Sequence, residues 1–247
     1  EKYGDDAIYK DGLKIYTTLD MDAQNAAVAA MQNLPDFYTD KNGLHQPQGA
    51  IVAMNPHNGY IVAMVGGRGD DAFNRATQAE RQPGSSMKPF VYLAAIQSGK
   101  TPGSIVEDSP VSFGSWSPKN YENDYVGSIT YRYALQHSRN VAAVKIADEV
   151  GMTKVIKLAK EMGISTLTDQ DYNLSTALGG LTHGVTPLDM VQAYGVLANG
   201  GIKVQPTAIL KIVDRNGQVV EEHSIQEKRV VDEKDAAIIT NMLESVI

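Results

Sequence analysis

The first fifty residues change from the two-residue period of a strand to the longer period of a helix. Residues 13–20, LKIYTTLD, alternate apolar and polar side chains as a half-buried strand does. Residues 23–32, AQNAAVAAMQ, then form a helical pattern, and Asp20 or Asp22 stands where a helix N-cap belongs. The pattern therefore predicts a strand that leads directly into a capped helix.

Two pairs of apolar runs are each separated by residues that favour a tight reversal. Residues 50–54 and 60–65 flank Asn-Pro-His-Asn-Gly, and the runs within 208–224 flank Asn216-Gly217. Both segments are predicted to be β-hairpins. The strands of the first hairpin are apolar nearly throughout, so we expect both of their faces to be covered, with helices as the cover.

Several longer segments carry the helical pattern, and glycine interrupts or ends most of them. Pro89 disfavours helical geometry at the residue before it, so the first turn there should be irregular, or the regular helix should begin at Pro89. Residues 101–127 are rich in Pro, Gly, Ser and Asn and predict an ordered loop. The predicted helices cover 89–98, 128–162 with an interruption at Gly151, 187–198 behind a Thr186 cap, and 232–247.

Composition narrows the classes of function. The 22 basic and 29 acidic residues give a net charge of −7 without any basic run, so the sequence lacks the electrostatic pattern of nucleic-acid binding. The absence of cysteine excludes disulfide scaffolds, thiol catalysis and cysteine metal sites. The five histidines show no paired metal-ligand spacing, and AAIQSGKT lacks the first glycine of a phosphate-binding loop. We therefore expect neither a metal nor a cofactor.

The segment QPGSSMKPF, residues 82–90, places Lys88 three residues after Ser85. Residues three apart on a helix share a face, so a helix beginning here would put an amine beside a hydroxyl. A serine becomes a nucleophile when a base takes its proton, and lysine serves as that base when burial or a second cation lowers its pKa from about 10.4. On this spacing alone, a solvated helix lysine is the commoner alternative.

A second polar cluster, HSRN at residues 137–140, lies between two helical patterns. Ser138 and Asn140 can direct a hydroxyl and an amide into the same site, although serine and asparagine within helices commonly bond only to nearby backbone. The two clusters together indicate catalysis more strongly than either does alone.

Three longer stretches extend these clusters: QPGSSMKPF, NYENDYVGSITYRYALQHSRNVAAVKIA and ALGGLTHGVTPLDMVQAYGVLANGG. In this order and spacing they resemble the transpeptidase domain of class A, bifunctional, penicillin-binding proteins. The opening YGDDAIYKDGLKIYTTLD resembles the segment that joins such a domain to its glycosyltransferase partner. The resemblance implies a linker and domain start at 1–48, a transpeptidase domain at 49–247, and an α/β (α+β) fold whose mostly antiparallel central sheet is packed between helices, as in serine β-lactamases.

The resemblance also implies a serine DD-transpeptidase that works without a cofactor. Ser85 would attack the D-Ala-D-Ala bond of a peptidoglycan stem peptide, and Lys88 would accept its proton. Ser138 would relay a proton to the departing amine, and Asn140 would hold the lysine and the substrate amide. An amine of a neighbouring stem peptide would complete the cross-link, and β-lactams would acylate the same serine. By its position, Tyr121 would wall the substrate groove.

One motif of the resembling family is missing from this sequence. Lys-Thr-Gly or Lys-Ser-Gly does not occur, and residues 100–103, KTPG, are interrupted and lie too early. We expect the chain to stop before that motif, so that this polypeptide alone would be incomplete and a missing C-terminal piece of the same domain would be its partner. The resemblance further implies an extracytoplasmic protein, anchored to the cell membrane through an upstream segment outside this chain.

Two alternatives stay open. A hydrolytic enzyme, either a DD-carboxypeptidase or a β-lactamase, would release its acyl group to water, but the sequence lacks the Glu-x-x-Leu-Asn segment of class A β-lactamases. A non-catalytic scaffold or antibiotic sensor would share the fold. The missing third motif favours that alternative, and the presence of Ser85, Lys88, Ser138 and Asn140 disfavours it.

Overall fold

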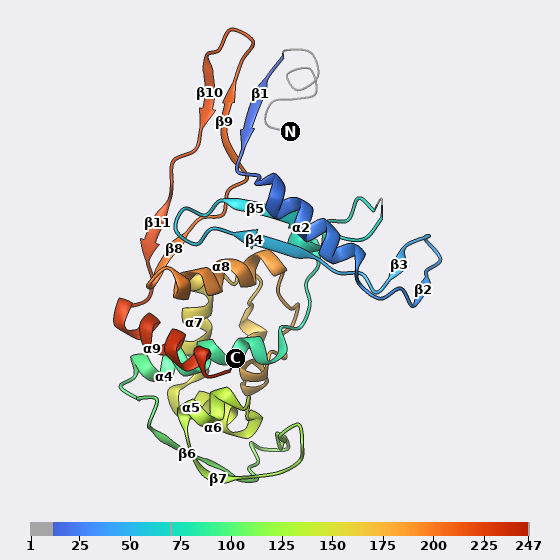
Figure 1. Ribbon diagram of the computed structural model, residues 1–247. Helices are drawn as coiled ribbons and strands as arrows, with labels where there is room; N and C mark the ends of the chain where they lie inside the picture. Colours follow the sequence, from blue (N-terminus) through green and yellow to red (C-terminus); the bar gives the residue numbers. More distant parts are fainter. Residues whose placement is uncertain (1–11, 70, 247) are drawn as a thin grey trace. The chain divides into compact units, whose positions relative to one another are not determined.

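The computed structural model describes residues 12–69 and 71–246, which divide into two compact units (Figure 1). One unit runs up to Gln78 and takes in Val204–Lys228, and the other consists of 79–203 with the residues from Arg229 onward. Residues 1–11, which carry half of the stretch that resembles a linker, lie outside the described residues. Two short strands, β8 (Ile202–Val204) and β11 (Glu227–Arg229), lie where the chain passes between the units.

The first unit contains a three-stranded antiparallel sheet in the order β1-β9-β10 (Figure 1). Its strands are β1 (Lys14–Thr17), β9 (Ile209–Val213) and β10 (Val219–Glu222). The predicted strand at 13–20 and the predicted hairpin at 208–224 are both confirmed. Gly217 has a φ of 82° in the turn between β9 and β10, where a side chain would be strained.

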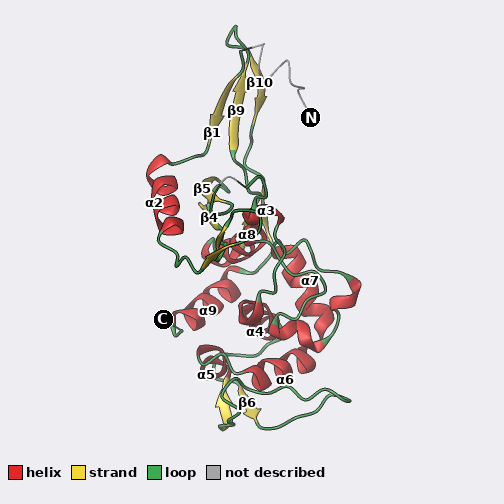
Figure 2. Cartoon of the chain, turned by 90° about the vertical axis from the view of Figure 1, so that its right-hand side faces the viewer, coloured by secondary structure: helices red, strands yellow, loops and turns green. Residues whose placement is uncertain are grey.

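Helix α2 (Met21–Gln32) lies beside the antiparallel hairpin of β4 (Ile51–Met54) and β5 (Ile61–Val65) (Figure 2). Asp20 is the cap, because its side chain accepts hydrogen bonds from two N–H groups of the first turn. Within β4 and β5 only Ala63 is buried, so these strands are covered less completely than their apolar runs predict. The unit also holds β2 (Tyr38–Thr39), β3 (His45–Gln46) and α3 (Arg75–Gln78).

The second unit is built around helix α4 (Lys88–Gln97). Every residue of α4 from Phe90 to Ile96 is at most 6% exposed, and a helix that is apolar on all sides belongs in a core. Thr186 caps α8 by a reciprocal pair of hydrogen bonds with Asp189, as its position predicts. The surrounding helices are α5 (Tyr131–Gln136), α6 (Asn140–Val150), α7 (Met152–Met162), α8 (Pro187–Ala198) and α9 (Glu233–Glu244), with 3-10 turns at Gly84–Met87, Asp169–Asp171 and Leu174–Leu178.

A short hairpin in this unit departs from the sequence prediction. Strand β6 (Ile105–Asp108) interrupts the predicted loop at 101–127, and its antiparallel partner β7 (Gly127–Thr130) replaces the predicted start of a helix. Both expectations were wrong, because two adjacent apolar residues, Ile105 and Val106, are too short a run to show the strand period. The predicted fold class, helices with antiparallel strands, is confirmed.

Candidate active site

Ser85 lies in the 3-10 turn Gly84–Met87, directly before α4. We call residues 81–87 the Ser85 turn. The irregular first turn predicted from Pro89 is confirmed, and the regular helix begins at Lys88. The Ser85 side chain is exposed, and in the described part of the chain no hydrogen bond engages its hydroxyl, whereas Lys88 is buried. The turn therefore presents a free hydroxyl to solvent and sends the lysine inward.

Residues 179–185 hold the Ser85 turn through backbone-like contacts. The Gln82 side chain donates to the Leu181 carbonyl at 2.7 Å and accepts from the Leu181 N–H at 2.6 Å, as a strand backbone would. Arg81 and Val185 form an antiparallel bridge with N···O distances of 3.0 and 2.8 Å. These contacts fix the chain immediately before Ser85.

Two glycines meet at this contact. A Cβ on Gly179 would lie 2.3 Å from the Gly84 nitrogen, and the φ of Gly179 is 78°. A side chain at this position would therefore both collide with the backbone and strain its own residue. On the other side of the turn, the Tyr194 hydroxyl donates to the Ser86 carbonyl at 2.9 Å.

Lys88 is 1% exposed, and its amine contacts the segment that carries Ser138. The Lys88 Nζ lies 2.9 Å from Ser138 Oγ, 2.5 Å from the Ser138 carbonyl oxygen and 2.6 Å from Asn140 Oδ1. Burial lowers the pKa of Lys88 from 10.5 to about 8. At neutral pH this lysine is thus much closer to losing its proton than a surface lysine is.

The acceptors around Lys88 decide what each protonation state can do. Two of the three are carbonyl-type oxygens, those of the Ser138 backbone and the Asn140 side chain, which only accept hydrogen bonds. An ammonium satisfies all three acceptors. A neutral amine can satisfy both carbonyl-type oxygens with its two protons, and its lone pair is then left for a hydroxyl. The site is therefore suited to proton transfer between lysine and serine hydroxyls.

Ser138 lies in the short break between α5 and α6, and Asn140 is the first residue of α6. We call residues 137–140 the Ser138 turn. Ser138 has a φ of 50°, a left-handed conformation that costs a non-glycine residue about 1 kcal/mol. In this conformation both the backbone carbonyl and the side-chain hydroxyl of Ser138 contact the Lys88 amine. His137 stacks on Tyr133 with ring centroids 3.9 Å apart, which supports the turn from its N-terminal side.

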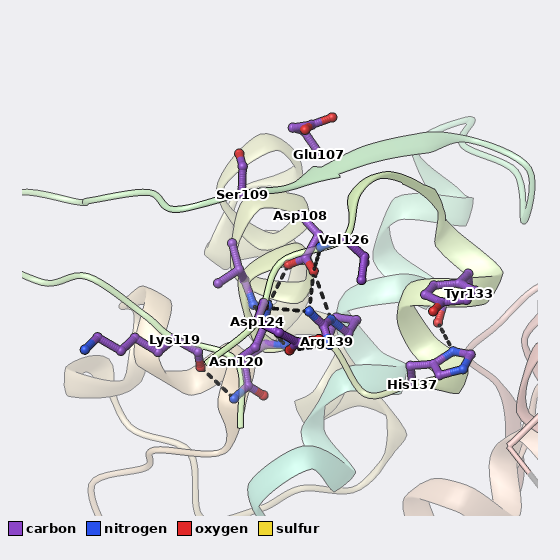
Figure 3. Close-up of polar contacts among 12 residues, drawn as sticks. Glu107, Asp108, Ser109, Lys119, Asn120, Asp124, Val126, Tyr133, His137 and Arg139 are labelled. Carbon is purple, nitrogen blue, oxygen red and sulfur yellow. Dashed lines mark hydrogen bonds and ion pairs between the residues drawn. The ribbon is translucent and has the colours of Figure 1, made fainter. Parts of the chain in front are cut away.

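Arg139, which lies between Ser138 and Asn140 in the Ser138 turn, takes part in a buried polar network (Figure 3). Arg139 is bound to Asp108, which is 0% exposed, with Nη2···Oδ2 at 2.7 Å. Arg139 also pairs with Asp124 at 2.9 Å. Burial by itself lowers the pKa of Arg139, but the bonds with Asp108 and Asp124 outweigh it and raise that pKa above its ordinary value. Arg139 is therefore a permanent cation.

The structure brings three of the five predicted site residues into hydrogen-bond contact. Lys88, Ser138 and Asn140 are in hydrogen-bond contact, and Ser85 lies one turn before Lys88 on the same segment. Tyr121 is 93% exposed, so its predicted contact with a ligand stays a prediction.

Sequence reasoning missed the supporting residues of the site, namely Gln82, Asp108, Asn120 and Arg139. Three of them, Gln82, Asn120 and Arg139, stand in the stretches that carried the resemblance. Those stretches were the available signal. No local pattern, however, links Asp108 with Arg139, whose side chains meet across 31 residues of chain.

Comparisons with known proteins identify relatives of the chain. A model of the penicillin binding protein transpeptidase domain matches residues 49–247. Penicillin-binding protein 1A of Rickettsia conorii is 40% identical over 204 residues, 79% of this chain and 25% of that protein. Penicillin-binding protein 2D of Bacillus subtilis is 38% identical over 245 residues, 96% of this chain and 34% of that protein. The chain thus spans about a quarter to a third of the length of these curated relatives.

Solved structures with a similar fold agree with this result. The penicillin-binding protein PonA1 from Mycobacterium tuberculosis superposes with a TM-score of 0.84 at 27% identity, covering 98% of this chain and 65% of that chain. The same protein in complex with penicillin V gives a TM-score of 0.82.

Within the described residues, no helix is both long and apolar enough to cross a membrane, and no group of three His, Asp or Glu side chains is placed to hold a metal.

Proposed function

The chain belongs to the family of penicillin-binding protein transpeptidase domains, and from this premise we propose that it cross-links peptidoglycan as a serine DD-transpeptidase. One observation carries the proposal. Lys88 is buried, its pKa falls to about 8, and it contacts Ser138 and Asn140 while standing one turn after an exposed and unengaged Ser85. This arrangement supplies a base, a nucleophile and a second hydroxyl within one unit.

In the proposed acylation, neutral Lys88 takes the proton of the Ser85 hydroxyl as its oxygen attacks the carbonyl carbon of the D-Ala-D-Ala bond. The C–N bond then breaks, and the leaving amine receives a proton from Ser138, which recovers one from Lys88. D-Ala departs and an ester on Ser85 remains. An amine of a second stem peptide attacks this ester, forms the new amide and returns the proton to Ser85.

The same hydroxyl would react with β-lactams. The neighbour PonA1 has been solved in complex with penicillin V, at 27% identity to this chain. A strained lactam amide presents the same bond to Ser85, but its leaving amine stays tethered, so the acyl-enzyme persists. Stem peptides as substrate and an extracytoplasmic, membrane-anchored location belong to the same proposal, because peptidoglycan is assembled outside the cytoplasm. The division of the chain into a linker and domain start at 1–48 and a transpeptidase domain from residue 49 is part of the same proposal.

Labelling by a fluorescent penicillin tests the nucleophile. The wild-type protein, expressed at its full natural length, should acquire a covalent label that Ser85→Ala loses. Ser86→Ala is the matched control, because Ser86 is also an exposed serine of the same turn. Persisting label in Ser85→Ala, or loss in Ser86→Ala alone, would refute the assignment of Ser85.

A second assay separates transfer from hydrolysis. The protein is given a donor ending in D-Ala-D-Ala together with a labelled D-amino acid. A transpeptidase incorporates the label into the donor in exchange for D-Ala. Release of D-Ala without incorporation would identify a carboxypeptidase, and absence of both products with retained penicillin labelling would favour a sensor module.

A further inference from the structure

Asn120 is a buried side chain, 4% exposed, in which every hydrogen-bonding group is used. Its Oδ1 accepts from the N–H groups of Asn140 at 2.9 Å and Val141 at 3.1 Å. Its Nδ2 donates to Asp108 Oδ1 at 2.8 Å and to the Asp124 carbonyl at 2.9 Å. A side-chain amide offers two acceptor sites and two donors, so Asn120 has no unused capacity.

The two N–H groups that Asn120 binds are the first of helix α6. Such groups have no partner within their own helix and need a cap. Arg139 stands at the N-cap position and makes no capping bond with its side chain. Asn120 supplies the cap from a distant segment and thereby fixes the backbone of Asn140.

The neighbour of Asn120 fixes the Asn140 side chain. Asn140 Nδ2 donates to the Lys119 carbonyl at 3.0 Å, which leaves Oδ1 for Lys88 at 2.6 Å. Reversing this amide would set an N–H against the lysine amine. Residues 119 and 120 therefore determine both the place of Asn140 and the direction of its amide.

Asp108 joins this cap to the charge of Arg139 (Figure 3). One carboxylate oxygen of Asp108 accepts from Asn120, and the other accepts from Arg139 Nε at 2.9 Å and Nη2 at 2.7 Å. Ser138 and Asn140 contact Lys88, and the residue between them is held by Asp108. The Ser138 turn is thus held both by its contacts with Lys88 and by the bond between Arg139 and Asp108.

We propose that Asn120, braced by Asp108 and Arg139, is a positioning residue that holds Ser138 and Asn140 against Lys88 for proton transfer. Asn120 touches none of the reacting groups and acts through the first turn of α6. The inference rests on the proposed function, since it concerns the rate at which Ser85 is acylated. Removing Asn120 should impair acylation beyond what lost stability explains.

The test compares acylation by penicillin in four variants, as second-order rate constants per folded molecule. Asn120→Ala should lower the rate constant about 100-fold, the size of effect that a misplacement of about 1 Å produces. Asn120→Asp should be as slow, because it sets a carboxylate against Asp108. The double variant Asn120→Asp with Asp108→Asn restores a donor–acceptor pair between residues 120 and 108 but leaves the Asp124 carbonyl without its donor, so it should recover about tenfold over Asn120→Asp. Asp232→Ala, which removes the cap of α9, is the control and should leave the rate unchanged.

A dependence on pH distinguishes positioning from mere stability. Asn120→Ala should move the pH midpoint of acylation, because the surroundings of Lys88 change, and Asp232→Ala should not. A folded Asn120→Ala protein with a near wild-type rate and an unmoved midpoint would overturn the inference. If that variant does not fold, a folded double variant that is no faster than Asn120→Asp overturns it instead. Failure of wild type itself to be acylated would contradict the proposed function rather than the role of Asn120.

Discussion

The Ser85 turn and the Ser138 turn are held in place by different forces. The Ser85 turn is fixed by shape and backbone pairing, through the contact of Gly179 with Gly84 and the strand-like pairing of Gln82 with Leu181. The Ser138 turn is fixed by buried charge, through the contact of Arg139 with a fully buried carboxylate. The first leaves its hydroxyl exposed, and the second carries groups that face a buried lysine.

The difference fits the chemical role that we propose for each turn. A nucleophile must be reachable by a large substrate, so its side chain cannot be packed against other groups of the protein. The surrounding backbone has to hold it in place instead. A proton-relay group works against a desolvated amine, where hydrogen-bond direction decides function. Steric contacts tolerate almost no added atoms, whereas a charge network tolerates exchange of partners if donors still face acceptors.

The strongest way to break the Ser138 turn is to remove one charge. Asp108→Ala leaves Arg139 buried without its main partner, which should lower the free energy of unfolding by about 3–5 kcal/mol. Asp124→Ala removes the other partner, whose side chain is 50% exposed, and should cost below about 1 kcal/mol. Urea denaturation of both variants measures the contrast. Equal losses would contradict a network centred on Asp108.

A single added methyl group should destabilise the Ser85 turn. Gly179→Ala should lower the free energy of unfolding by about 2–4 kcal/mol, because the φ of 78° adds strain to the collision with Gly84. Gly99→Ala is the matched control, since Gly99 has a φ of 91° but open space around its missing Cβ, and it should cost about 1 kcal/mol. Thermal unfolding resolves the two. Similar costs would mean that strain alone, without the glycine contact, matters.

A milder change sharpens the role of backbone pairing. Gln82→Ala removes both bonds to Leu181 and should cost about 1–2 kcal/mol, with slower acylation of Ser85. Gln82→Glu keeps the acceptor for the Leu181 N–H but sets a carboxylate oxygen against the Leu181 carbonyl, so it should cost at least as much. Chemical denaturation and penicillin acylation of the same samples test this. Unchanged acylation in Gln82→Ala would show that the pairing does not position Ser85.

A change of pH should have the smallest effect, and it tests the protonation of the buried Lys88. Acylation should rise between about pH 6 and pH 9, because Lys88 becomes a base as it loses its proton. The pKa of Lys88 is ordinarily 10.5 and falls to about 8 in the folded protein. Between about pH 8 and pH 10.5, Lys88 therefore carries a proton in the unfolded chain but not in the folded protein. Stability should therefore rise with pH across that window, remain level below it, and show no such rise in Lys88→Met. A flat acylation profile would count against Lys88 as the base.

The sequence was informative where structure follows from neighbouring residues. The helices, both hairpins and the irregular turn before Pro89 could be predicted, since each depends on local periodicity or a single backbone restriction. The supporting contacts could not. Gln82 meets Leu181 across 99 residues, and the β6–β7 register that brings Asp108 toward Arg139 depends on tertiary packing. Polar side chains that support a site therefore look like ordinary surface residues in the sequence.

The left-handed conformation of Ser138 has an evolutionary consequence. One of the oxygens that grips Lys88 there belongs to the peptide backbone, so no codon change at this position can delete it. Selection can alter or discard the hydroxyl, but replacements are confined to residues that accept a φ near 50°, with glycine and asparagine foremost. Drug-driven variation at residue 138 should accordingly be sparse, and any surviving variant inherits part of the lysine's binding from the main chain.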